Sequence, residues 1–222
     1  MDPNPTHALF ERLSDRARER LLDASFRKSL NAGDRLFLRG DSASEVYVIE
    51  SGRLAVQRER HDGTILTYTV LGPGGVLGEL AYLEGVPRRG ASVLAMERAK
   101  LTGVPFDVLD ELRESDPSVD RFLIEIMRRE VLRLSRHVVV TAYGSVDERV
   151  AFALRLLLGP VTGPPPYPVA VTQTDLASVA GLTRSTTNRS LRDLGEAGVI
   201  EVRRGRILAL DLERLDALAE VD

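Results

Sequence analysis

Between residues 27 and 104, glycine-centred turns recur about every 8–12 residues, and this spacing constrains the fold more than any other feature. The segments between the turns, such as residues 46–49 and 54–57, alternate as strands do. Short strands at this interval are typical of a β-sandwich or barrel, so we expect a β-roll. Asp62-Gly63 is a good hairpin turn, because glycine accepts a positive φ. The other turns include Gly33-Asp34, Gly40-Asp41, Ser51-Gly52 and Glu84-Gly85.

Residues 118–140 change to a helical pattern. Apolar side chains recur there at intervals of three and four, which is the spacing of a coiled-coil seam. The seam consists of Ile124, Met127, Val131, Leu134, Val138 and Thr141. Asp116-Pro117-Ser118 supplies the helix start, since proline is tolerated in the first turn. A helix packed on its own domain would also show an apolar stripe, but a seam this long favours a partner helix and hence a homodimer.

Composition excludes several classes of protein. The chain has 222 residues, no cysteine and a net charge of −3. Without cysteine there are no disulfides, no cysteine-ligated iron–sulfur or zinc sites and no thiol catalysis. No apolar run approaches the roughly 20 residues of a membrane span, and residues 1–12 lack the apolar core of a secretion signal. We therefore expect a cytoplasmic protein without a membrane partner, and any nucleic-acid binding must rest on local charge.

Residues 78–93 combine a carboxylate and two arginines in a glycine-rich context. A short helical turn after Gly78 would direct backbone N–H groups at an anion, and an arginine can bind a phosphate with two hydrogen bonds. The carboxylate of Glu79 suits a ribose hydroxyl. The same residues also fit a surface loop with a salt bridge, and residues 72–75 lack the spacing and the lysine of a P-loop.

Residues 171–200 have the pattern of a helix-turn-helix. Thr172 is a good N-cap with Asp175 three residues on, Gly181 makes the tight turn, and Thr183 caps a second helix. The inner face of that second helix is Thr187, Leu191 and Leu194, and its opposite face carries Arg184, Ser185, Asn188, Arg189 and Arg192. We expect DNA contacts from Thr172, Thr183, Arg184, Ser185, Thr186, Asn188 and Arg189, with base edges read at the N-terminal end of the helix.

A basic hairpin follows the second helix. Residues 199–202 and 207–210 would form its strands, and the wing between them carries Arg203, Arg204 and Arg206, which we expect to contact the DNA backbone. From residue 170 to residue 210 there are six arginines against four acidic residues. A helical hairpin used only for protein contacts would not explain the caps, the glycine turn and the basic wing together.

These motifs, in this order, resemble the cyclic-AMP receptor/FNR family of bacterial transcription regulators from about Leu9 to the end of the chain. In the β-roll the resemblance rests on Gly33-Asp34, Phe37, Gly40-Asp41, Tyr47-Val48-Ile49, Gly52, Asp62-Gly63, Gly78-Glu79-Leu80 and an Arg-x-Ala-x-Val ending. It implies an α+β protein with a cyclic-nucleotide-binding-like β-roll at 1–116, a long dimerisation helix at 117–143 and a winged helix-turn-helix DNA-binding domain at 144–222.

The resemblance also implies an effector site. In relatives that bind cyclic AMP, a Gly-Glu-Leu sequence and an arginine hold the cyclic phosphate and the ribose, which implies Gly78, Glu79 and Leu80 here. The arginine is Arg89 when the alignment is anchored on residues 91–93 and Arg88 when it is anchored on Pro87, so both stay open.

Three residues depart from the family pattern. Gly90 follows the arginine where a serine or threonine is common. Of two hydroxyl residues that reach the purine, one position is Leu134, while Ser135 is retained. Ser185 stands where the family often has glutamate, so the familiar half-site cannot be assumed.

The function implied is a non-enzymatic regulator that binds an approximately palindromic site in double-stranded DNA, with RNA polymerase as a further partner. Cyclic AMP is the candidate effector, and activation of transcription is expected, although the residues leave the direction of control open. The lack of cysteine excludes an iron–sulfur sensor, and His7, His61 and His137 make no haem-ligand pattern, so we expect no metal. The alternatives are a regulator that responds to another signal, and a nucleotide-regulated enzyme, for which no catalytic constellation is present.

Overall fold

The computed structural model describes residues 9–59, 61, 65–159, 161, 163–169 and 171–220. Contacts divide the chain into two compact units, residues 1–58 with 71–131 and residues 59–70 with 132–222. The hairpin turn predicted at Asp62-Gly63 lies outside the described residues.

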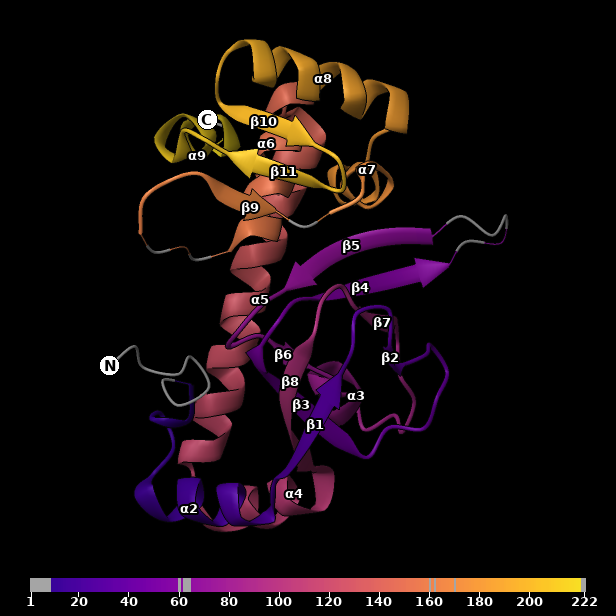
Figure 1. The fold of residues 1–222 in the computed structure, drawn as a ribbon. Helices are drawn as coiled ribbons and strands as arrows, with labels where there is room; N and C mark the ends of the chain where they lie inside the picture. The colour runs from indigo at the N-terminus through magenta and orange to yellow at the C-terminus, as the bar shows by residue number, and fades with distance from the viewer. Residues whose placement is uncertain are drawn as a thin grey trace. The chain divides into compact units, whose positions relative to one another are not determined.

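The β domain contains two four-stranded sheets (Figure 1). The first has the order β1-β8-β3-β6, with bounds Phe26–Leu30, Ala99–Pro105, Glu45–Ser51 and Val76–Leu77. The second has the order β2-β7-β4-β5, with bounds Arg35–Phe37, Ser92–Ala95, Leu54–Glu59 and Ile65–Leu71. The pairings of β3 with β8 and of β4 with β7 are antiparallel. The β domain predicted from the glycine spacing is therefore confirmed.

Helices α2 (Asp15–Ala24), α4 (Phe106–Ser115) and the first part of α5 (Ser118–Tyr143) share one apolar core with strand β3. The core side chains include Phe10, Leu21, Val48, Leu109 and Phe122. Burial of each such side chain contributes roughly 1.5–3 kcal/mol, so this core fixes the start of α5 on the β domain.

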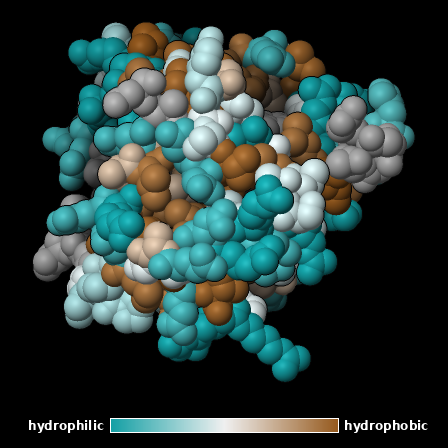
Figure 2. Space-filling model, turned by 90° about the horizontal axis from the view of Figure 1, so that it is seen from above, coloured by the Kyte–Doolittle hydropathy of each residue, from teal (hydrophilic) through white to brown (hydrophobic). Residues whose placement is uncertain are grey.

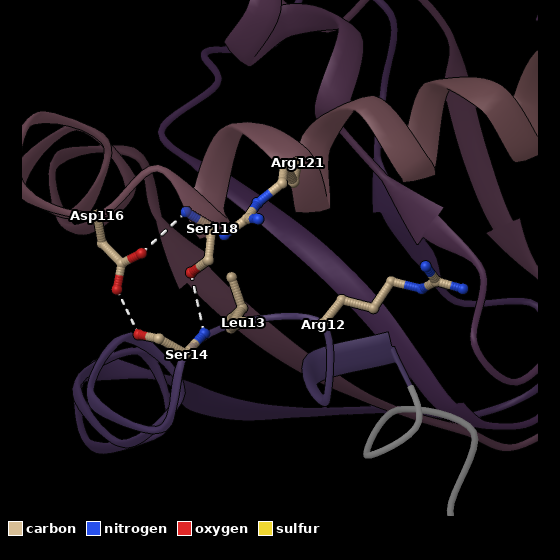
Figure 3. Close-up of a pocket in the computed structure, with 6 residues that line it drawn as sticks. All are labelled: Arg12, Leu13, Ser14, Asp116, Ser118 and Arg121. Carbon is tan, nitrogen blue, oxygen red and sulfur yellow. Dashed lines mark hydrogen bonds between the residues drawn. The ribbon is translucent and has the colours of Figure 1, made fainter.

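The start of α5 is also held by a polar joint, which Figure 3 shows in a pocket lined by Arg12, Leu13, Ser14, Asp116, Ser118 and Arg121. The Ser118 backbone N–H donates to Asp116 at 2.8 Å, and the Ser14 hydroxyl donates to the same carboxylate. The Ser14 backbone N–H donates to the Ser118 hydroxyl oxygen at 2.9 Å. The hydrogen bonds from Ser14 and Ser118 lower the pKa of Asp116 to about 2. Because these polar groups satisfy one another, the pocket is a joint between α2 and α5.

Within the second unit, the part that begins at residue 146 is a winged helix-turn-helix. Its helices are α6 (Val146–Leu158), α7 (Gln173–Ala180), α8 (Arg184–Glu196) and α9 (Leu212–Ala219). A three-stranded sheet has the order β10-β11-β9, with bounds Ile200–Arg203, Arg206–Ala209 and Tyr167–Val169 (Figure 1). The β10–β11 hairpin is the wing that the sequence predicts, and its strands are shifted by one residue from the predicted bounds. Among the described residues, no helix has the length and apolar character that crossing a membrane requires.

Candidate functional site

The two neighbouring arginines of the β domain point in opposite directions. Residues 87–89 run antiparallel beside residues 40–43: the Arg89 N–H donates to the Asp41 carbonyl at 2.9 Å, and the Gly40 N–H donates to the Arg89 carbonyl at 2.8 Å. Successive side chains of an extended segment lie on opposite faces. Arg89 is accordingly buried, at 3% exposed, while Arg88 is exposed and donates to the Gly40 carbonyl at 3.0 Å.

The buried guanidinium of Arg89 is bound mainly by Glu45. Its Nη1 donates to the Glu45 carbonyl oxygen at 2.8 Å, and its Nη2 donates to Glu45 Oε1 at 3.1 Å. The guanidinium carbon lies 4.3 Å from the centroid of the Phe37 ring, within the range of a cation–π contact. Nε is buried and has no hydrogen-bond partner among the residues that the structure describes. Burial lowers the pKa of Arg89, but an arginine stays charged at any physiological pH.

Glu45 is the centre of this cluster. Its carboxylate accepts hydrogen bonds from the hydroxyl groups of Ser44 and Tyr47, the latter at 2.7 Å. Burial raises the pKa of Glu45, but the hydrogen bonds from Ser44 and Tyr47 and the charge of Arg89 outweigh burial, so this pKa lies below its ordinary value. Sequence reasoning missed Glu45. One signal was available: Glu45 and Tyr47 are two residues apart on one strand and therefore share a face.

Gly78 lies directly against Arg89. It precedes the short helix α3 (Glu79–Leu83) with a φ of 88°, which favours glycine. A Cβ atom at position 78 would lie 2.3 Å from Arg89 Nη1 and 3.0 Å from the Glu45 carbonyl oxygen. A residue with a side chain would be strained at this φ and would collide with Arg89. Gly78 and Arg89, both predicted effector residues, are therefore direct neighbours in the structure.

The other predicted effector residues differ in exposure. Glu79 is buried, at 9% exposed, in the first turn of α3. Leu80 is 53% exposed. Ser135 is an exposed residue of α5 and belongs to the second compact unit. These roles remain predictions.

The helix-turn-helix is fixed by its caps, as predicted. The Thr172 side chain accepts from the Asp175 N–H at 3.1 Å, and the Thr183 side chain accepts from the Thr186 N–H at 3.2 Å. The turn between α7 and α8 is held from outside by a residue that sequence reasoning missed. Arg149 of α6 donates to the carbonyls of Ala180 and Gly181, at 3.1 and 2.7 Å.

Helix α8 buries one face and exposes the other. The buried residues are Thr187, Ser190, Leu191 and Leu194. The exposed residues of the other face include Arg184, Ser185, Arg189 and Arg192. Asn188 departs from the predicted exposed face: it is half-buried, and its side-chain oxygen is buried without a partner among the described residues. The cause is helical geometry, since Asn188 lies on the flank of the buried face, about 60° around the helix from buried Leu191.

Three arginines lie at the wing, and they differ in their contacts. Arg203 is paired with Glu201 through two hydrogen bonds of 2.7 and 3.0 Å, which hold it along the hairpin. Arg204 and Arg206 are exposed. Figure 2 shows a face on which hydrophilic side chains are mixed with smaller hydrophobic patches. The exposed arginines of α8 and the wing provide the local positive charge that the net charge of −3 does not.

A β domain with a buried arginine, followed by a winged helix-turn-helix with exposed arginines, defines the class of DNA-binding transcription regulators. Residues 27–116 match the family model of the cyclic nucleotide-binding domain, and residues 148–218 match that of the Crp-like helix-turn-helix domain. The chain belongs to the CRP/FNR family of transcription regulators, which is not a family of enzymes.

Individual relatives cover most of the chain. It is 29% identical over 188 residues to the cyclic AMP receptor protein of Thermus thermophilus, which covers 84% of this chain and 85% of the relative. It is 26% identical over 187 residues to the CRP-like cAMP-activated global transcriptional regulator of Mycobacterium tuberculosis, and the match covers 82% of this chain and 83% of the relative. Among solved structures, the c-di-GMP-responsive regulator CLP of Xanthomonas campestris has the same fold, with a TM-score of 0.72 at 22% identity over 89% of this chain and 99% of that one.

Proposed function

We propose that this transcription regulator acts as a homodimer on an approximately palindromic DNA site and is controlled by a nucleotide whose phosphate binds Arg89. The observation that carries the DNA part is the exposed arginine face of α8, which begins at a capped N-terminus with Arg184. A recognition helix reads base edges with its N-terminal residues, and arginine binds guanine bidentately. Because its target would be chromosomal DNA, we place the protein in the cytoplasm, with RNA polymerase as the further partner.

The proposed dimer forms through α5. Ile124, Val131 and Val138 follow the predicted seam and are 65%, 60% and 63% exposed in the single chain. A row of exposed apolar side chains is unfavourable in water, and heptad spacing matches it to a second copy of the same helix. Met127 departs from the seam, because it packs partly against the core of its own β domain.

The effector part rests on the chemistry of the pocket. Arg89 presents a permanent charge and a buried Nε without a partner among the described residues, and its Nη1 lies beside Gly78, where a side chain would clash. An arginine beside a glycine is suited to a phosphate, since guanidinium donors match phosphate oxygens. Two relatives are named for cyclic AMP and one structural neighbour for c-di-GMP, so we take cyclic AMP as the first candidate and c-di-GMP as the second.

The DNA part is tested by selection from a random pool of duplexes with purified protein. We expect the selected sequences to share a twofold-symmetric site. Recovery of no common sequence would contradict the proposal.

The effector part is tested by melting curves with cyclic AMP, cyclic GMP and c-di-GMP, because a ligand that binds the folded state raises the melting temperature. No shift with any of them would favour a regulator that responds to another signal.

A further inference from the structure

The two terminal nitrogens of Arg89 are bound by Glu45, while Nε has no partner among the described residues. Glu45 accepts from both terminal nitrogens, through the backbone oxygen at 2.8 Å and the carboxylate at 3.1 Å. The carboxylate thus presents to the guanidinium the same kind of charged oxygen that a phosphate would present.

The guanidinium of Arg89 is also closely packed. Arg89 lies between Glu45 and the backbone of Gly78, so close to Gly78 that a Cβ atom there would be 2.3 Å from Nη1. The ring of Phe37 lies 4.3 Å from the guanidinium carbon. The Glu45 carboxylate accepts from Nη2, so a phosphate that binds this nitrogen competes with the carboxylate and is repelled by its charge.

Of the two partners, Glu45 is the one able to leave. The Arg89 side chain is 2% exposed, whereas the Glu45 side chain is 23% exposed. Glu45 is the first residue of β3, and its other side-chain partners are the hydroxyl groups of Ser44 and Tyr47. A carboxylate that turns toward water regains hydration, while a buried arginine without a counter-charge would be costly.

We propose that the Glu45 carboxylate is a built-in competitor of the effector phosphate: it neutralises Arg89 when no phosphate is bound, and it lowers the affinity of the pocket because it competes with the phosphate for Nη2. This inference rests on the proposed nucleotide control of the β domain. It makes Glu45 a residue that determines how strongly phosphate-bearing ligands are admitted.

The test compares ligand affinities of Glu45→Gln and the native protein by calorimetric titration with cyclic AMP and c-di-GMP. Glu45→Thr is a second variant in case the glutamine variant does not fold. We expect loss of the charge to tighten binding of at least one nucleotide by about tenfold or more, because tenfold corresponds to about 1.4 kcal/mol and close charge pairs couple by at least that much. Adenosine, which lacks a phosphate, should show no such gain.

Glu97→Gln is the matched control. It removes the carboxylate of another ion pair of the β domain, formed with Arg53 at 2.7 Å, and should leave the nucleotide affinity unchanged. The inference is overturned if the folded Glu45 variants bind every nucleotide no more tightly than the native protein, including the case in which none of the proteins binds. DNA selection with the same variants distinguishes failure of this inference from failure of the proposed DNA binding. A symmetric site together with unchanged nucleotide affinity would refute the role of Glu45 and leave the proposed DNA binding intact.

Discussion

Arg89 carries a permanent positive charge at a place that water hardly reaches. Such a charge is tolerated only when a counter-charge is near, and Glu45 provides one. Arg88, one residue earlier, is exposed to solvent, so its charge needs no counter-charge from the protein. Alignment alone could not choose between them. The pairing of residues 87–89 with 40–43 shows which one points inward, because it fixes the face on which each side chain lies.

Replacing Arg89 by alanine should abolish most of the affinity for the effector nucleotide. The phosphate charge would lose its partner, at a cost of roughly 2–5 kcal/mol in binding free energy, and Glu45 would remain as an unpaired repelling charge. Arg88→Ala removes the same charge from the surface and should leave the affinity unchanged. Titration calorimetry on both variants checks this, and equal losses in the two would contradict the assignment.

His137 on α5 should make the second unit sensitive to mild acid. Its ring packs edge-on against Phe152 at 5.6 Å, and burial together with the charges of Arg133 and Arg149 lowers its pKa below 6.5. The folded protein then resists protonation that the unfolded chain accepts near pH 6.5. The free energy of unfolding is therefore highest above that pH and falls as the pH drops from 6.5 toward the folded pKa.

Urea unfolding between pH 8 and pH 5 measures this effect. His137→Phe should show a flatter dependence than the native protein in the window just below pH 6.5, because the buried titrating group is gone. Identical dependences for the two proteins would contradict the interpretation.

At the scale of elements, we expect the arginines of α8 and those of the wing to have different roles. Arg184 lies in the first turn of α8, where we expect base edges to be read, and Arg204 and Arg206 lie at a hairpin that we expect to contact phosphates. Arg203 has Glu201 as a partner, so removing it would also release a carboxylate. Arg184 and Arg206 are therefore the cleaner pair to compare.

Arg184→Ala should cost about 1–3 kcal/mol at the selected site and relax the preference at one base position, with little change in salt dependence. Arg206→Ala removes the same charge from the wing. It should weaken binding to all sequences alike and reduce the slope of affinity against salt by about one. Fluorescence anisotropy with specific and scrambled duplexes at several salt concentrations distinguishes them, and interchange of the two behaviours would refute the assigned roles.

Elements with local signals could be predicted from the sequence, and contacts between distant segments could not. Thr172 and Thr183 mark helix starts by their own side chains, so α7 and α8 were predictable. The pairing of Glu45 with Arg89 joins residues 44 positions apart, and no local pattern indicates it. Met127 belongs to the periodic seam by spacing, yet it packs partly on its own domain, because periodicity does not say which partner covers a face.

At the scale of the whole molecule, the proposed dimer depends on the exposed seam of α5. Leu134 is 41% exposed in the single chain, and replacing it by aspartate would place two like charges at the axis of a parallel pair. We expect Leu134→Asp to sediment as a monomer and to bind the selected site far more weakly. Arg136→Asp, on an exposed position away from the seam, is the control and should stay dimeric. A native protein that is monomeric at micromolar concentration would contradict the dimer.

A twofold dimer should place two copies of α8 in successive major grooves, about 34–36 Å apart. Protection of guanine N7 from methylation reports this directly, because N7 lies in the major groove, where arginine binds it. On the selected site we predict two symmetric clusters of protected guanines about 10 base pairs apart, with protection lost in both clusters for Arg184→Ala. A single cluster, or protection that survives in Arg184→Ala, would contradict recognition of DNA by paired α8 helices.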